Sequence, residues 1–379
     1  MAVYLDYNST TPVDPRVLEA MLPYFSEKFG NAASKTHSFG WIAEAAVEKA
    51  REQTAKLINA TPHEIIFTSG ATEAINLAIK GVWENYQTNG NHIVTVSTEH
   101  KAVLDTCKFL ETKGAQVTYL PVNREGLIDL QQLRESISEK TILVCVMYAN
   151  NETGVIQPIS EISKIVHEKG SILMSDATQA VGKIKADVES DRIDLLCLSA
   201  HKIYGAKGIG ALFVRRKDPR VTLSPLIHGG GHERGLRSGT LNVPGIVGLG
   251  KACEIAEKEM WDDAQRISQL RTLLEQNLLD LEKIFVNGSI KHRLPNVTNL
   301  SFQGIKADSL IAKLPDIAVA TGSACTSAIP EPSHVLKAMA VSNEMAYSSI
   351  RFSLGKLTTK EEIEIVSEKV KVLLKEIRS

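Results

Sequence analysis

EIIFTSG (residues 64–70), followed by ATEAINLAIKGVWENY (71–86), reads as a short apolar strand, a glycine turn and an amphipathic helix. The same alternation extends outward from this stretch. Further strands are predicted at 92–99, 116–122, 142–150, 171–178 and 194–202, and further helices at 100–114 and 159–170. Strands joined by helical crossovers predict an α/β fold with a mainly parallel central sheet and helices on both faces. Such sheets bind ligands at the carboxyl ends of their strands.

The pattern changes from about residue 259. A long helix at 264–284, a strand at 296–304 and a closing helix at 360–377 predict a smaller α+β domain. We therefore expect a large cofactor-binding domain at 14–258. The small domain is expected at 1–13 and 259–379, and it would carry the loop around Cys325.

Composition limits the classes of partner. The 379 residues carry a formal net charge of −1 with 43% apolar residues, typical of a globular protein of about two domains. A balanced charge gives no general electrostatic hold on nucleic acid or on a membrane. The N-terminus has no signal-peptide pattern, and no run of about 18 apolar residues is present, so a cytoplasmic location is expected.

Two familiar nucleotide motifs are missing. GIVGLGKA (245–252) resembles a phosphate-binding loop, but Ala252 stands where a magnesium-binding hydroxyl is needed, and no strand precedes it. No GxGxxG sequence is present. A nicotinamide dinucleotide site therefore has little support.

The five cysteines form no CxxC pair, so neither a zinc site nor a redox dithiol is indicated, and no metal is expected. Cys107 and Cys253 lie in helical patterns, and Cys145 and Cys197 in strand patterns; buried, inert thiols are expected there. Cys325 differs because it lies among small polar residues in GSACTSA (322–328). It is either a reactive thiol on a loop or a loop thiol without consequence.

Polar groups follow successive strands. Thr68–Glu73 at a helix start can hold a phosphate or act as an ordinary N-cap. Asp176, at a strand end, needs a partner such as a protonated ring nitrogen or an arginine. Lys202 is either a solvated turn residue or an amine held in a covalent imine. With His100, these are the parts of a pyridoxal phosphate site.

Over almost its whole length, from YLDYNSTTPVDPRV (4–17) to SSIRFSLGKLTT (348–359), the sequence resembles the cysteine desulfurases of the IscS/NifS type. These are fold-type-I pyridoxal phosphate enzymes of the class V aminotransferase kind. The resemblance rests on stretches that occur in the same order: FTSGATEAINLAIKG (67–81), TEHKAVLDTC (98–107), NNETGV (150–155), DATQAVGK (176–183), SAHKIYGAKGIGAL (199–212), HGGGHERGLRSGT (228–240) and GSACTSA (322–328).

The resemblance implies roles for matching positions. Lys202 would bond covalently to the cofactor, Asp176 would pair with its ring nitrogen, and His100 would stack on the ring and carry a proton. The remaining cofactor contacts would come from Ala71, Thr72, Asn151, Gln179, Ser199 and His201, and from Thr240 of the neighbouring subunit in a homodimer. Asn151 and Arg351 would hold the substrate carboxylate, for which the planar guanidinium of arginine is suited.

Cys325 would take sulfur from L-cysteine as a persulfide and release L-alanine. A loop of small residues suits a thiol that must move between the cofactor and an acceptor. Longer relatives of the IscS type carry a further C-terminal tail that helps to dock the iron–sulfur scaffold, whereas this sequence ends at Ser379, soon after its last predicted helix. The expected acceptor therefore stays open among iron–sulfur scaffold proteins, tRNA-thiolation proteins and thiamine-type pathways. A transient iron–sulfur contact through the persulfide is the one metal contact expected.

One sequence departure and two alternative functions accompany this interpretation. Ala206 replaces the proline of the GPKG sequence that is common in the family, which changes loop stiffness more than chemistry. A selenocysteine lyase, or another lyase or aminotransferase of this fold, is the nearest alternative. The loop around Cys325 discriminates against an aminotransferase, because an aminotransferase needs no nucleophilic thiol. A non-catalytic partner would have no need of Lys202, Asp176, His100 and Cys325, so the presence of these residues argues against that alternative.

Overall fold

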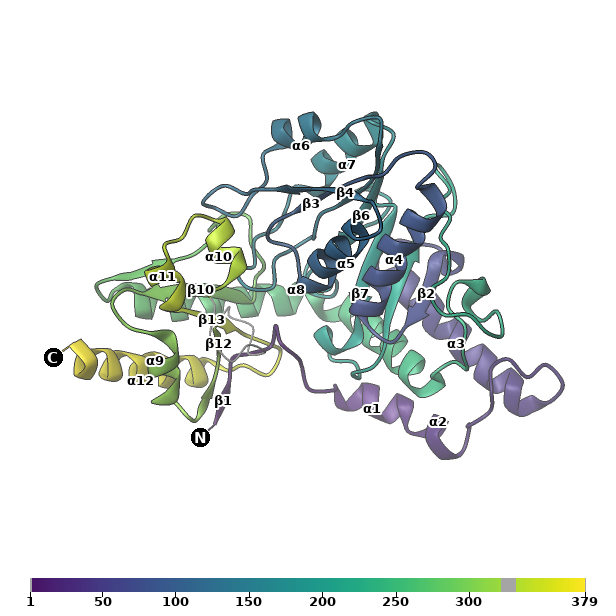
Figure 1. Ribbon diagram of the computed structural model, residues 1–379. Helices are drawn as coiled ribbons and strands as arrows, with labels where there is room; N and C mark the ends of the chain where they lie inside the picture. Colours follow the sequence, from purple (N-terminus) through teal and green to yellow (C-terminus); the bar gives the residue numbers. More distant parts are fainter. Residues whose placement is uncertain (1, 322–331, 379) are drawn as a thin grey trace.

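A seven-stranded sheet lies at the centre of the larger part of the molecule (Figure 1). In pairing order its strands are β2 (Ile65–Thr68), β8 (Gly210–Val214), β7 (Leu195–Ser199), β6 (Ile172–Asp176), β5 (Thr141–Cys145), β3 (His92–Val96) and β4 (Gln116–Leu120). The computed structural model describes residues 2–321 and 332–378. Within these ranges the predicted α/β fold is confirmed.

Strand β8 is the one strand of this sheet that runs against its neighbours, and it is missing from the sequence prediction. The connection from β7 to β8 consists of residues 200–209. That is too short for a helical crossover, which takes about a dozen residues or more. The chain therefore turns back and pairs antiparallel.

Both faces of the sheet are covered by helices, because successive side chains of a strand point to opposite faces. On β2, Ile65 and Phe67 pack into one core and Ile66 into the other. The helices of the larger part are α1 (Pro15–Met21), α2 (Pro23–Ser26), α3 (Ser38–Leu57), α4 (Ala71–Tyr86), α5 (Lys101–Glu111), α6 (Leu130–Ser136) and α7 (Ile159–Glu168). Helices α4 and α5 cover one face, and α3, α6 and α7 cover the other.

A second core lies around a four-stranded antiparallel sheet. Its strands, in pairing order, are β12 (Ala320–Thr321), β13 (Ser349–Ser353), β10 (Val297–Phe302) and β9 (Ile284–Val286). The short strand β1 (Val3–Tyr4) pairs with β11 (Ile317–Ala318), which brings the chain's beginning to this part. The helices here are α9 (Ala307–Ala312), α10 (His334–Ala338), α11 (Asn343–Tyr347) and α12 (Lys360–Arg378).

One long helix, α8 (Val243–Leu279), joins the two cores (Figure 1). Its first half packs into the larger core through Ile246 and Leu249, and its second half into the smaller core through Leu270 and Leu274. The break that the sequence pattern suggested near 259 is thus a change of packing partner within a continuous helix. The division into domains at 258/259 stays a prediction.

Four cysteines, Cys107, Cys145, Cys197 and Cys253, are buried free thiols. Burial raises the pKa of Cys107 and of Cys253 to about 12, and the pKa values of the other two well above the usual range. The prediction that these thiols are buried is therefore confirmed, and their raised pKa values favour the less reactive protonated form. Across the described ranges, no helix has the length and apolar character needed to span a membrane.

Candidate active site at the carboxyl ends of the strands

A cavity of about 670 Å³ opens where the strands of the large sheet end. Of the described residues that the sequence predicted for the site, all but Thr240 line it. They are Ala71, Thr72, His100, Asn151, Asp176, Gln179, Ser199, His201, Lys202 and Arg351. Thr240 is exposed and does not line the cavity of its own chain. Cys325 lies outside the described residues.

The start of helix α4 forms an anion cradle on the cavity wall. Gly70 precedes the helix with φ 154°, and no side chain caps the first turn, whereas Asp14, His100 and Asn242 cap α1, α5 and α8. The N–H groups of Ala71 and Thr72 are therefore available at the positive end of the helix dipole.

Asp176, the last residue of β6, is buried in the cavity wall. Its Oδ1 accepts a hydrogen bond from the Thr178 N–H at 3.0 Å, and within the described ranges it forms no salt bridge. The neighbouring Thr178 Oγ1 is buried and has no hydrogen-bond partner in the part of the chain that the structure describes. Buried polar groups of this kind are costly unless a partner satisfies them, so a ligand with a protonated ring nitrogen suits the position.

Lys202 follows β7 and points its amine at the N-terminal segment. Its Nζ donates to the main-chain oxygens of Asn8 and Ser9, both at 2.6 Å. Burial, and then the positive charge of Arg351, lower the pKa of Lys202 to about 8, while Asp176 and Asp6 oppose the shift. An amine with this pKa is available as a nucleophile near neutral pH.

Two histidines lie on the cavity wall with different hydrogen bonding. The Nδ1 atom of His100 accepts the Ala102 N–H at 3.1 Å, so a neutral ring carries its proton on Nε2. Burial and the lysines nearby, Lys202 first, lower the pKa of His201 to about 4. His201 is therefore neutral at physiological pH, with Nδ1 3.2 Å from Thr10 Oγ1.

Gln179 is held in one orientation by a second buried lysine. Lys183 Nζ donates to Gln179 Oε1 at 2.5 Å and to Asn8 Oδ1 at 3.3 Å, and Gln179 Nε2 donates to the Asn8 carbonyl at 3.0 Å. Burial, followed by the charge of Lys202, lowers the pKa of Lys183 well below its usual value. One hydrogen of the Gln179 amide thus remains for a ligand.

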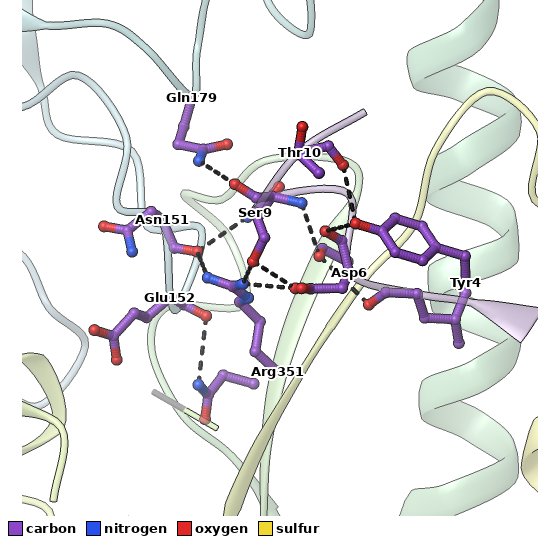
Figure 2. Close-up of polar contacts among 12 residues, drawn as sticks. Tyr4, Asp6, Ser9, Thr10, Asn151, Glu152, Gln179 and Arg351 are labelled. Carbon is purple, nitrogen blue, oxygen red and sulfur yellow. Dashed lines mark hydrogen bonds and ion pairs between the residues drawn. The ribbon is translucent and has the colours of Figure 1, made fainter. Parts of the chain in front are cut away.

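Arg351, on β13, brings a guanidinium into the cavity from the smaller sheet (Figure 2). Its Nη1 donates to the Asn151 carbonyl at 3.0 Å, and its Nη2 to Asp6 Oδ1 and Ser9 Oγ, both at 2.7 Å. Asn8 Nδ2 also donates to the Asn151 carbonyl, at 3.1 Å. The side chain of Asn151 is free to contact a ligand together with Arg351.

The sequence analysis missed Asn8, Ser9 and Thr10, which also line the cavity. Asn8 is almost fully buried, and its oxygens accept from both buried lysines and from Gln179. The signal was present as a run of small polar residues, NSTT at 8–11, soon after the short strand β1. Lys207, also on the wall, and Lys183 were missed as well.

These groups fit pyridoxal phosphate. The uncapped start of α4 suits the phosphate, the buried Asp176 carboxylate suits a protonated pyridine nitrogen, and the Lys202 amine of lowered pKa suits a covalent bond to the aldehyde carbon. Among the described residues no cluster of three or more His, Cys, Asp or Glu side chains could hold a metal ion.

Comparisons with known proteins agree with this fit. The family model described as aminotransferase class-V matches residues 3–366. A protein of Anaeromyxobacter sp. named cysteine desulfurase IscS is 55% identical over 98% of this chain and 93% of its own length. One of Neisseria meningitidis with the same name is 53% identical over 99% of this chain and 93% of its own length.

Two solved structures are similar to this chain over most of its length. A structure titled NIFS-like protein superposes with a TM-score of 0.92 and 41% identity, covering 99% of this chain and 100% of the other. A structure titled SspA in complex with cysteine has a TM-score of 0.83 and 38% identity, covering 94% of this chain and 100% of its own. At 41% and 38% identity, both proteins are similar to this chain in sequence as well as in fold.

Proposed function

The chain belongs to the class-V aminotransferase family and is a pyridoxal-phosphate-dependent cysteine desulfurase, and from this premise we propose how its own residues turn L-cysteine into L-alanine and pass the sulfur on. The single observation that carries the proposal is the cavity of about 670 Å³ whose wall combines an anion cradle, a buried acid and a lysine of lowered pKa.

Several residues of the cavity wall would bind the cofactor. Ala71 and Thr72 would bind the phosphate through their N–H groups, with the Ser199 and His201 side chains beside them. Asp176 would keep the ring nitrogen protonated, and Gln179, held by Lys183, would donate to the ring oxygen. Bound pyridoxal phosphate supplies an electron sink for the substrate's carbon skeleton.

Substrate positioning and proton transfer fall to three further residues. Arg351 and the Asn151 side chain would hold the substrate carboxylate, which fixes the amino acid at one end. His100 would lie against the ring and exchange a proton at Nε2, the nitrogen left free by the Ala102 N–H. Lys202 would return protons to the substrate carbon, because its amine titrates near neutral pH.

Cys325 would be the sulfur acceptor. Its thiolate attacks the substrate sulfur, a sulfur–sulfur bond forms and the carbon–sulfur bond breaks. The bonding electron pair stays with the carbon fragment, which takes up a proton and leaves as alanine. The product on the enzyme is a persulfide.

The test compares wild type with Cys325→Ala, each given L-cysteine and a reductant, and measures alanine and sulfide. We expect wild type to make both, and the variant to make neither while it keeps the yellow colour of bound cofactor, with absorbance near roughly 400 nm. Cys253→Ala removes a buried thiol elsewhere and is the matched control, with activity retained. Full activity in Cys325→Ala would instead favour a selenocysteine lyase or another lyase of this fold.

The sulfur would go to an iron–sulfur scaffold protein, a tRNA-thiolation protein or both. Incubating the persulfide form with each purified acceptor and following labelled sulfur distinguishes them. The cytoplasmic location expected from the sequence stays a prediction.

A homodimer would complete the site. Large apolar side chains are exposed on the segment from α1 to the start of α3: Leu18, Leu22, Phe25, Phe29, Phe39, Trp41 and Ile42. Exposed apolar side chains that gather on one segment are typical of a protein interface. Thr240, exposed and outside the cavity of its own chain, would reach the phosphate in the partner's site.

A further inference from the structure

The guanidinium of Arg351 is engaged by the N-terminal segment of its own chain (Figure 2). Asp6 Oδ1 and Ser9 Oγ each accept a hydrogen bond from Nη2 at 2.7 Å, and Ser9 Oγ also donates to Asp6 Oδ1 at 2.9 Å. Nη1 donates to the Asn151 carbonyl at 3.0 Å. The Arg351 side chain is 8% exposed and that of Asp6 is 20% exposed.

These contacts use both hydrogens of Nη2. A carboxylate can bind a guanidinium at two points in two ways, end-on through Nη1 and Nη2, or side-on through Nε and Nη2. Both ways require Nη2. Among the residues that the structure describes, Arg351 Nε is buried and has no hydrogen-bond partner. The side-on edge therefore lacks only the Nη2 hydrogen that Asp6 or Ser9 now accepts.

We propose that Asp6 is an internal stand-in for the substrate carboxylate: it holds Arg351 in place before substrate arrives and gives up Nη2 when the amino acid binds. The proposal rests on the proposed role of Arg351 in binding the substrate carboxylate. Asp6 would then set substrate affinity, because each carboxylate ligand must compete with it for the same donor.

The surroundings allow this exchange. Asp6 is partly exposed and has a second hydrogen-bond partner in the Ser9 hydroxyl, so its carboxylate can be solvated after it leaves Nη2. The incoming carboxylate replaces the negative charge that Asp6 withdraws. The positive groups at this end of the cavity, Arg351 and Lys202, therefore keep a compensating anion throughout.

The experiment uses the holoenzyme of Asp6→Asn, which keeps the shape of the side chain and a weaker hydrogen bond but loses the charge. We expect KM for L-cysteine to fall by roughly three- to tenfold, the range of a partly exposed charge pair. The dissociation constant of L-alanine should fall by a similar factor. The inhibition constant of cysteamine, which lacks a carboxylate, should stay unchanged.

Two further variants sharpen the result. Ser9→Ala frees the other Nη2 hydrogen and should lower KM in the same direction by a smaller factor; it also tests the proposal if Asp6→Asn fails to fold. Asp14→Asn removes the acid of another aspartate–arginine pair, Asp14–Arg16, 2.7 Å apart at the start of α1. It is the matched control and should change neither constant.

An Arg351→Lys variant distinguishes a failure of the proposed function from a failure of the stand-in role of Asp6. If it leaves KM and the L-alanine constant unchanged, Arg351 does not bind the carboxylate and the proposed function loses that assignment. If Arg351→Lys raises KM and the dissociation constant of L-alanine, but Asp6→Asn raises KM or leaves it unchanged, the stand-in role of Asp6 is overturned. A fall in the cysteamine constant equal to that of L-alanine would overturn it too, since the effect would not depend on the carboxylate.

Discussion

The amine of Lys202 lies under opposing electrostatic influences. Burial and Arg351 favour its neutral form, whereas Asp176 and Asp6 favour its charged form, and the outcome is a pKa of about 8. Only the neutral amine attacks an aldehyde. The capture of cofactor by the apoenzyme should therefore depend on pH in the range where an ordinary lysine, with a pKa near 10.4, is still fully protonated.

The expected result follows from the sign of the shift. The neutral fraction of Lys202 rises from about one tenth at pH 7 to about nine tenths at pH 9. The rate of covalent cofactor capture, followed by absorbance after rapid mixing, should thus rise through pH 8 and then level off. An Arg351→Gln variant, which removes the main cationic influence, should move the midpoint upward. A rate that keeps rising tenfold per pH unit up to pH 10 would contradict the lowered pKa.

Sequence reasoning identified those site residues that end or follow a predicted strand, such as Asp176 and Lys202, because the fold gathers strand ends at one edge. It missed Asn8, whose contacts join it to residues far away in the chain, among them Lys183 and Asn296. It likewise gave no hint that Asp6 pairs with Arg351. No local pattern encodes such contacts, since they arise from tertiary packing.

At the scale of elements, strand β8 supports the anion cradle. A Cβ atom on Gly210 would lie 2.6 Å from the Leu198 oxygen and 2.7 Å from the Gly70 Cα. Gly210 therefore lets β8 approach both β7 and Gly70, the residue that precedes α4. The sequence analysis overlooked the apolar run GALFV (210–214) that forms β8. Its antiparallel direction follows from the short connection after Lys202 and could not be read from the run itself.

This contact makes a testable prediction. Gly210→Ala should push Gly70 away, raise the dissociation constant of the cofactor and destabilise the fold by about 1–3 kcal/mol, the usual cost of overpacking. Gly170→Ala is the matched control: it strains a backbone at φ 75° in open space, far along the chain from the cradle. Both variants should lose thermal stability, but only Gly210→Ala should lose cofactor affinity in a titration of the apoenzyme. Equal affinity in the two would show that the cradle does not depend on this packing.

At the scale of the whole molecule, the cavity combines groups from both cores. Asp176 and Lys202 come from the large sheet, whereas Arg351 comes from the small sheet. We propose that the domains divide as predicted, at 1–13 and 259–379 against 14–258, with α8 as the shared helix. The hydrogen bond from Arg351 to the Asn151 carbonyl then connects the two parts, whereas the ion pair of Arg351 with Asp6 lies within the small one.

A dimer is expected because the segment from α1 to the start of α3 carries several exposed large apolar side chains, which are typical of a protein interface. Phe29 and Phe39 of this segment are 65% and 50% exposed, and their ring centroids lie 5.7 Å apart. The double variant Phe29→Asp/Phe39→Asp should be monomeric in analytical ultracentrifugation, since a buried aromatic side chain contributes about 1.5–3 kcal/mol and a buried unpaired charge opposes association. Trp261→Asp, at a similarly exposed position on α8, is the matched control and should remain a dimer.

The same double variant tests whether the partner completes the site. If Thr240 reaches the phosphate of the neighbouring subunit, the monomer loses one phosphate ligand, and its dissociation constant for the cofactor should rise by roughly fivefold or more, as for one lost hydrogen bond to a charged group. Thr240→Val in the dimer should reproduce that loss without changing the oligomeric state. A monomer that binds the cofactor as tightly as the dimer would place the whole phosphate site within one chain, on the α4 cradle and the Ser199 and His201 side chains.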